Sequence, residues 1–261
     1  MLVTRVERLH GAAPRADGRL RIFSFAVEAT VDGPVDARSG MVVNLAEMKA
    51  ELRRIVVEPL DGRCFNGEAG VPALKTPELV AREIWNRLDG RLCGLPLHRV
   101  RLRETGQTIA YRRRGEETME ITRVFEFSAS HRLHSSRLSD AENRNVFGKC
   151  NNPAGHGHNY VLEVTMKGAP GSSGELVPAA DFDRVVNEAV VDAWDHRHLN
   201  SDRPEFRDVN PTAEEIARVA WARLEKPLAA ITPGTARLHR VKLLETARNH
   251  VEYFGPQGDG E

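Results

Sequence analysis

Polar and apolar residues alternate in several stretches of this chain, and alternation with a period of two predicts β-strands. In the second half these stretches lie near 119–128, 158–167, 236–245 and 249–254. Helices are expected at roughly 180–193 and 213–226, and Thr212 with Glu215 predicts a capping box at the start of the second helix. Each half of the chain then has the order strand, strand, helix, helix, strand, strand.

The two halves of the chain are related by an internal duplication. Residues 2–7, 76–85 and 100–105 echo residues 120–125, 212–221 and 241–246, in the same order. In the first half, Thr76 and Pro77 supply the expected N-cap and first turn of a helix. Two ββααββ units built on antiparallel sheets predict an α+β protein. We place the first unit at residues 1–116 and the second at 117–261.

The composition argues against several classes of partner and location. Lysine and arginine together number 37, as do aspartate and glutamate, so the charge balance gives no indication of a nucleic-acid or membrane-surface partner. No apolar stretch reaches the ~18 residues that a membrane span requires. The sequence from Met1 onward has no apolar signal core, and three cysteines, an odd number, do not indicate a disulfide framework. These features predict a cytoplasmic protein.

One segment carries most of the candidate chemistry. Cys150 lies six residues before His156, and His156 and His158 share one face of the strand that follows. A catalytic zinc site takes three protein ligands and keeps a fourth position open, and these two imidazoles would supply two of the three. His131, at the end of another alternating run, is the natural third ligand. The sequence therefore predicts a metal site with a nucleophile or base beside it.

Each of these features also has a purely structural explanation. A His-x-His pair alone is weak evidence for a metal, and a lone cysteine such as Cys150 is more often a small buried hydrophobic residue. The pair Asp195-His196 could simply close a helix. A carboxylate beside an imidazole is, however, also the arrangement that orients the ring for proton transfer. The combination of all these residues in one chain favours the functional interpretation.

The motifs around these residues closely resemble those of the 6-pyruvoyl-tetrahydropterin synthase family. The resemblance rests on residues 127–133, 138–143, 148–160, 194–200, 211–214 and 241–246, and it covers nearly all of 119–254 in the family's order. It implies that each unit is a tunnelling fold, whose sheets join around an axis into a barrel with the helices outside. A single unit leaves sheet edges unpaired, so we expect a homo-oligomer, either a trimer or a hexamer.

The family converts 7,8-dihydroneopterin triphosphate to 6-pyruvoyl-tetrahydropterin in tetrahydrobiopterin biosynthesis, releasing triphosphate, and the resemblance implies roles for residues of this chain. The Zn²⁺ ligands would be His131, His156 and His158. The zinc ion would stabilise the negative charge that forms as a C–H proton leaves. Cys150 would be the base for that proton. His196, supported by Asp195, would be the second acid–base group, which in this family reaches the site from a neighbouring subunit.

The resemblance also implies a binding site for the pterin ring. Glu245 would anchor the ring by accepting hydrogen bonds from its amino group and a ring N–H. Thr212 and Glu214 are further pterin-binding candidates, although Thr212 also suits a helix cap and Glu214 a first-turn acid favoured by the helix dipole. Ala213 stands where the family often has a second hydroxyl, which predicts one pterin contact fewer.

The first unit does not carry the same chemistry. Its counterparts of His131, His156-Gly-His158 and Asp195-His196 are Ala13, Arg21-Ile-Phe23 and Asp61-Gly62. The loop that would carry the cysteine is missing, while Glu104 is retained at the position of Glu245. We therefore interpret the first unit as a degenerate scaffold, in which Glu104 remains a candidate for binding a ligand.

Two other functions fit the same residues. 6-Carboxy-tetrahydropterin synthase, on the pathway to 7-deazaguanine-modified (queuosine-containing) tRNA, uses the same substrate and zinc site but cleaves a carbon–carbon bond. Its members place fewer residues between the cysteine and the His-Gly-His triplet than the five found here, 151–155, which favours the pyruvoyl product. The other candidate is a non-catalytic zinc-binding or pterin-binding protein. Cys150, Asp195 and His196 argue against it, because binding alone requires none of them.

Overall fold

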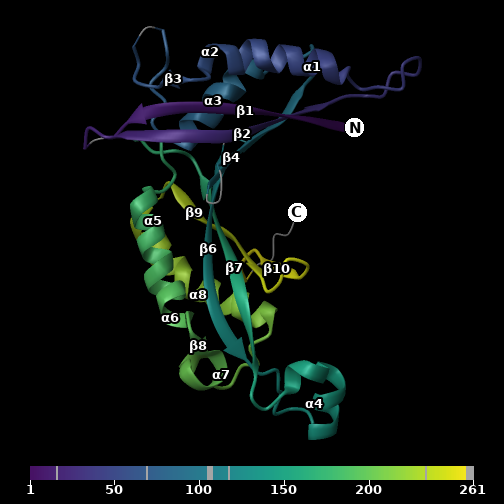
Figure 1. The fold of residues 1–261 in the computed structure, drawn as a ribbon, viewed down its shortest axis with the longest axis vertical. Coiled ribbons are helices and arrows are strands. Elements are labelled where there is room, and N and C mark those ends of the chain that lie inside the picture. The colour runs from purple at the N-terminus through teal and green to yellow at the C-terminus, as the bar shows by residue number, and fades with distance from the viewer. Residues whose placement is uncertain (16, 69, 105–107, 117, 233, 257–261) are drawn as a thin grey trace. The chain divides into compact units, whose positions relative to one another are not determined.

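The computed structural model describes residues 1–15, 17–68, 70–104, 108–116, 118–232 and 234–256 (Figure 1). The chain divides into two compact units. The first consists of Met1–Thr122 together with Lys167–Leu176, and the second of Arg123–Met166 together with Val177–Glu261. Among the described residues, no helix is both long enough and apolar enough to cross a membrane.

The first unit is a four-stranded antiparallel sheet with a short parallel strand at one edge. The strand order is β5-β4-β2-β1-β3. The strands are β1 (Leu2–Pro14), β2 (Leu20–Asp32), β3 (Arg63–Cys64), β4 (Leu97–Glu104) and β5 (Thr108–Arg113). The helices are α1 (Leu45–Leu52), the π-helical turn η1 (Arg53–Val57), α2 (Glu58–Leu60) and α3 (Pro77–Leu88). Thr76 caps α3 by accepting a hydrogen bond from the Leu79 N–H, as its sequence predicts.

The second unit repeats this arrangement and adds helices around the predicted site. Its strand order is β10-β9-β7-β6, with β8 parallel to β6. The strands are β6 (Met119–His131), β7 (His156–Gly168), β8 (Arg197–His198), β9 (Ala236–Leu244) and β10 (His250–Tyr253). The helical segments are α4 (Asp140–Phe147), η2 (Gly148–Asn151), α5 (Ala179–Val186), η3 (Asn187–Val191), α6 (Asp192–Trp194), α7 (Leu199–Asp202), η4 (Pro204–Phe206) and α8 (Ala213–Ile231).

The predicted α+β class is confirmed, and both sheets are mainly antiparallel. The duplication extends to an uncommon detail, because the first long helix of each unit contains a π-helical turn, η1 in one and η3 in the other. Over the described residues the strand order does not return to its starting strand, so no barrel closes within one chain. Closing a barrel would require further units, so the oligomeric barrel stays a prediction.

Two local features differ from the sequence-based expectation. Helix α8 continues past Pro227 to Ile231, although a proline removes one backbone hydrogen bond inside a helix. Leu224 and Leu228 are both fully buried one turn apart, and this burial offsets the lost bond. Only half of the predicted capping box forms at Thr212: its side chain accepts from the Glu215 N–H, while the Glu215 carboxylate pairs with Arg218 at 3.2 Å.

The inner face of β6 is packed against helices, and this packing determines the environment of the predicted site. The ring of Phe125 packs at a tilt of 55° against the ring of Phe182 of α5, and Phe127 makes an edge contact with Trp194 of α6. His131 lies further along the same face of β6, because every second side chain of a strand points the same way. Its side chain is fully buried. The strand therefore carries the imidazole into the interior of the unit.

Candidate metal centre and active site

Three imidazoles converge in the second unit. His131 at the end of β6 meets His156 and His158 from the start of β7, and one ligand atom of each lies within 4.8 Å of the other two. The Nε2 atoms of His131 and His156 are 3.1 Å apart. Among the described residues these three form the only cluster of histidine, cysteine and acidic side chains with this geometry. Cys150 is not a member of it.

Two of the three imidazoles, those of His131 and His156, are disposed to be neutral, as metal ligands must be. The Nδ1 of His131 lies 2.7 Å from the carbonyl oxygen of Pro211, which can only accept, so Nδ1 carries the proton and Nε2 is left with a free lone pair. Burial lowers the pKa of His131 to about 4 and also lowers the pKa of His156. The buried His158 Nε2 has no hydrogen-bond partner in the described part of the chain. Three such nitrogens suit a metal that takes three protein ligands and leaves a position open.

Hydrogen bonds attach the Cys150 loop to the residues that directly follow His131. The carbonyl of Cys150, in η2, accepts from the Leu133 N–H at 2.9 Å, and the Asn151 side chain donates to the Leu133 carbonyl at 2.7 Å. Gly155 closes the loop with a positive φ of 71°, and a side chain there would lie 2.9 Å from the His131 carbonyl oxygen. These contacts hold the backbone of the Cys150 loop beside the residues that follow His131, and Cys150 itself is half-buried.

Asp195 and His196 form a hydrogen-bonded pair at the edge of β6. The Ser128 N–H donates to the Asp195 carboxylate at 2.7 Å, and this bond, followed by the bond with His196, lowers the pKa of Asp195. The other carboxylate oxygen lies 2.8 Å from the His196 Nδ1. The His196 side chain is 82% exposed, and its φ of 55° is unusual for a residue other than glycine. Strained backbone of this kind is often found at functional sites.

The three pterin-binding candidates line one cavity. Glu245, Thr212 and Glu214 face a space of about 530 Å³ that Arg248 and His250 also line. An oxygen of Glu245 is 3.6 Å from the Nε2 of His131 and 3.6 Å from that of His158. Glu245 therefore lies both in the lining of this cavity and beside the cluster of imidazoles. Thr212 also caps α8, so its structural and binding interpretations are both compatible with the structure.

Two contributors to the site were not found by sequence reasoning. Tyr160 is fully buried against the imidazoles, with ring centroids 6.2 Å from His131 and 5.4 Å from His158. Its hydroxyl has no hydrogen-bond partner among the described residues, and burial raises its pKa. The period of two from His156 and His158 to Tyr160 was a usable signal. No sequence signal indicated the Pro211 carbonyl that orients His131, because every residue has a backbone carbonyl and the residue pattern does not distinguish them.

The strand register relates the two units residue by residue. In the first unit Gly11 and Ala12 pair with Arg63 and Cys64, and in the second Ala129 and Ser130 pair with Arg197 and His198. The next residue along each long strand is Ala13 in the first unit and His131 in the second. Asp61 accepts from the His10 N–H at 2.8 Å, as Asp195 does from Ser128, and Gly62 has the positive φ, 70°, that His196 has.

Contacts within the first unit occupy the groups that correspond to the pterin-binding candidates. The Arg21 guanidinium donates to the Glu104 carboxylate at 3.2 Å. The Thr76 hydroxyl donates to the carbonyl of Gly174 at 3.0 Å. The buried carboxylate of Glu78, which follows Thr76 as Glu214 follows Thr212, accepts from the Leu176 N–H at 3.2 Å. Glu104 therefore has an internal partner.

The fold and the cluster of three imidazoles agree with the resemblance noted in the sequence. The chain matches the family model described as 6-pyruvoyl tetrahydropterin synthase twice, over residues 8–115 and 120–256. It therefore belongs to the 6-pyruvoyl tetrahydropterin synthase family and is a lyase. The double match extends the resemblance noted in the second half to the first.

About half of the chain is similar in sequence to proteins named for two different reactions. 6-Pyruvoyl tetrahydrobiopterin synthase of Poecilia reticulata is 46% identical over 52% of this chain and 89% of its own length, and the Homo sapiens protein is 43% identical over 52% and 91%. 6-Carboxy-5,6,7,8-tetrahydropterin synthase of Aquifex aeolicus is 31% identical over 51% and 96%. The structure of uricase from Arthrobacter globiformis covers 100% of this chain and 96% of its own, with a TM-score of 0.50 and 8% identity, a likeness of fold alone.

Proposed function

We propose that the protein converts 7,8-dihydroneopterin triphosphate to 6-pyruvoyl-tetrahydropterin and triphosphate, with zinc held by His131, His156 and His158. The observation that carries the proposal is the cluster of three imidazoles with the Cys150 loop attached beside it. A zinc ion bound there would supply a Lewis acid for the oxygens of the substrate side chain. The first unit would act as a scaffold, because Ala13 occupies the position of the first ligand.

In this proposal the remaining residues bind the substrate and move protons. Glu245, adjacent to the metal cluster, accepts hydrogen bonds from the pterin and fixes the ring so that its side chain reaches the cluster. Thr212 and Glu214 line the same cavity and contribute further contacts to the ring. Cys150 accepts the C–H proton as a thiolate. His196 holds the second proton, and the ionised Asp195 orients its ring and stabilises the imidazolium form.

We further propose that His196 acts in the site of a neighbouring subunit. His196 lines a cavity of about 580 Å³ with Ser128 and Asn159, whose side chains are hydrogen-bonded at 2.8 Å. By strand alternation Ser128 and Asn159 point to the opposite face of the sheet from the imidazoles of His131 and His158. The His196 ring lines the same cavity and is 82% exposed, so it is available to complete the site of another copy of the second unit.

The pyruvoyl product is favoured over the carboxy product by two observations. Five residues separate Cys150 from His156, more than in the carboxy-forming enzymes, and identity is 46% to a protein named for the pyruvoyl product against 31% to one named for the carboxy product. Both enzymes would use the same metal and base. Which product forms therefore depends on which bond of the substrate's side chain is held near Cys150.

Mass spectrometry of the product separates these possibilities. Purified protein loaded with zinc is incubated with 7,8-dihydroneopterin triphosphate under anaerobic conditions, and the pterin products are analysed. We expect the mass of 6-pyruvoyl-tetrahydropterin and stoichiometric triphosphate. The mass of the carboxy product would assign the protein to the alternative reaction. Tight substrate binding without any product would show a non-catalytic pterin-binding protein.

A further inference from the structure

The loop between β2 and α1 has a counterpart between β7 and α5. Residues 39–62 align with residues 173–196 without a gap, and the π-helical turns of the two units fall at the same place in this alignment. Gly40 therefore corresponds to Gly174, and both have a positive φ, 71° and 84°. Two backbone hydrogen bonds of one pattern close each loop, from Asp36 to Met41 and Gly40 to Asp36, and from Gly171 to Glu175 and Gly174 to Gly171.

The second of these loops lies on the first turn of α3, and both segments belong to the first unit. The Thr76 hydroxyl donates to the Gly174 carbonyl at 3.0 Å, and the Leu176 N–H donates to the Glu78 carboxylate at 3.2 Å. A side chain at Gly174 would lie 2.6 Å from that of Leu79. Gly174, Leu176, Thr76 and Glu78 are all buried. This loop and this helix start therefore form a closely packed contact.

The loop of residues 36–43 has the same backbone but lacks a comparable contact. Gly40 is exposed, and among the described residues nothing lies within 4 Å of a side chain built there. Val42, the counterpart of Leu176, is only half-buried. Three large apolar side chains on and beside the loop are exposed, those of Val35, Met41 and Leu45. Clustered exposed apolar residues are typical of an interaction surface.

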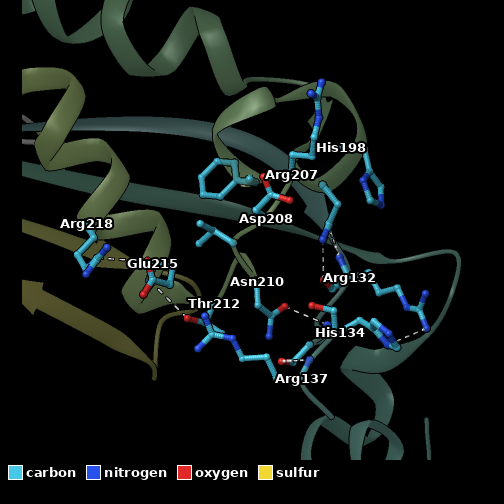
Figure 2. Close-up of a pocket in the computed structure, with 15 residues that line it drawn as sticks. Arg132, His134, Arg137, His198, Arg207, Asp208, Asn210, Thr212, Glu215 and Arg218 are labelled. Carbon is cyan, nitrogen blue, oxygen red and sulfur yellow. Dashed lines mark hydrogen bonds and ion pairs between the residues drawn. The ribbon is translucent and has the colours of Figure 1, made fainter. Parts of the chain in front are cut away.

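The start of α8 is the matching half of the missing contact. Thr212, Glu214 and Glu215 correspond to Thr76, Glu78 and Leu79. Glu214 is exposed, and in the described part of the chain its carboxylate makes no hydrogen bond or ion pair. Thr212 accepts from the Glu215 N–H, but over the same residues its hydroxyl does not donate. Figure 2 shows Thr212 and Glu215 in the wall of a cavity of about 780 Å³ that four arginines also line.

We propose that the loop of residues 36–43 of one chain binds the first turn of α8 of a second copy of this chain. In this interface the Gly40 carbonyl accepts from the Thr212 hydroxyl, and the Val42 N–H donates to Glu214. Each surface keeps the groups that the contact inside the first unit uses, and both are exposed within one chain. The interface pairs these groups and covers the apolar side chains around Met41.

The interface is independent of the proposed function, because it joins two copies whatever reaction they catalyse. It also leaves Glu214 able to bind a ligand. A carboxylate has about four acceptor positions, and the loop takes one of them. The tests below therefore measure association and contain no turnover, so their outcome does not depend on whether the pterin reaction takes place.

Gly40→Asn tests the loop side of the interface. Asparagine tolerates a positive φ, and the space around Gly40 is open in one chain, so the variant should fold. In the interface its side chain would meet Glu215, as a side chain at Gly174 would meet Leu79. We expect the dissociation constant of the full-length, zinc-loaded chains, measured by sedimentation velocity, to rise by at least about tenfold. The matched control is Gly90→Asn, at a glycine with a φ of 70° and equally open surroundings.

Glu214→Ala tests the α8 side and does not depend on how the loop tolerates asparagine. Loss of the acceptor for the Val42 N–H should raise the dissociation constant by about tenfold. Glu225→Ala, which removes an exposed carboxylate further along the same helix, is the control and should associate as the wild type does. A wild type that remains monomeric, or unchanged association in both Gly40→Asn and Glu214→Ala, would overturn the interface.

A disulfide identifies the two surfaces directly. Chains with Gly40→Cys are mixed with chains that carry Glu215→Cys, oxidised with glutathione disulfide, and mapped by peptide mass spectrometry. We expect a bridge between residues 40 and 215 of different chains, because the corresponding pair, Gly174 and Leu79, is in close contact. Gly90→Cys mixed with Glu215→Cys should give no bridge. A bridge that forms only within a chain carrying both cysteines, and never between separate chains, would place the contact inside one chain and overturn the proposal.

Discussion

The guanidinium of Arg21 donates a 3.2 Å hydrogen bond to the carboxylate of Glu104, and both side chains are about four-fifths buried. Glu104 corresponds to Glu245, whose carboxylate lies 3.6 Å from two imidazoles of the metal cluster in the second unit. Arg21 lies directly opposite Ala13 in the β1–β2 ladder, and Ala13 takes the place of His131. In the first unit, which lacks the three imidazoles, the positive side chain of Arg21 therefore lies beside Glu104.

The first prediction follows from this difference between the units. Purified protein should contain one zinc ion per chain, because only the second unit brings three imidazoles together. Elemental analysis of the protein measures the ratio, and His131→Ala should reduce it to near zero. Close to two zinc ions per chain would show that the first unit holds a metal by residues other than those expected.

The Arg21–Glu104 pair should contribute measurably to stability. Arg21→Ala leaves a largely buried carboxylate without its charged partner, which costs about 1–3 kcal/mol. The double variant Arg21→Ala/Glu104→Ala removes the stranded charge and should recover part of that loss. Urea unfolding measures the stability of both variants. The control is Arg19→Ala, which removes an exposed arginine two residues before Arg21. Equal stability of Arg21→Ala and the wild type would show that the pair is solvated and contributes little.

Cys150 is predicted to be the base and not a fourth metal ligand, since a ligand there would close the position that substrate oxygens need. Cys150→Ala should reduce turnover by about 10²-fold or more while zinc content stays near that of the wild type. Activity assays and metal analysis on the same preparation test both halves of the statement. Cys64→Ala, which changes an exposed cysteine of the first unit, is the matched control and should remain active. Loss of zinc together with activity would make Cys150 a structural ligand.

Active sites are predicted to contain residues from two chains. Cys150→Ala chains and His196→Ala chains should each be inactive, and mixing them under conditions of subunit exchange should restore activity, because some sites then combine an intact thiol with an intact imidazole. Mixing Cys150→Ala chains with chains that carry both changes controls for effects of exchange alone. If labelled chains demonstrably exchange and activity does not return, one chain supplies both residues.

Glu78 gives a prediction about pH. Burial raises the pKa of this carboxyl above its ordinary value of 4.5, because the charged form loses its hydration. Between pH 4.5 and the raised pKa the folded state binds more protons than the unfolded state, so stability falls as the pH rises through that window. Glu78→Gln keeps an acceptor for the Leu176 N–H and removes the charge. The variant should gain stability relative to the wild type as the pH rises from 4.5 towards 7, as measured by thermal unfolding. A difference between the two that is constant with pH would contradict the raised pKa.

The sequence determined the strands and helices well where the residue pattern is local. The alternating runs at 119–128 and 158–167 correspond to β6 and β7, and Thr76 and Thr212 both cap helices as their positions indicate. The missed helix α4 also had a local signal, since Ser139 and Glu142 form a complete capping box. The predicted end of α8, at residue 226, was wrong. The free energy gained by burying Leu228, a tertiary effect, outweighs the cost of Pro227 inside the helix.

The sequence by itself also identified the residues of the candidate site, because strand periodicity places His156 and His158 on one face whatever the rest of the chain does. Only the tertiary structure decided how these residues are used. It brought His131 within reach of the pair and oriented its ring through the Pro211 carbonyl. It also placed Arg21 against Glu104 and gathered four arginines around one cavity. These contacts join residues far apart in the chain, so they depend on packing and burial, which no local pattern of residues encodes.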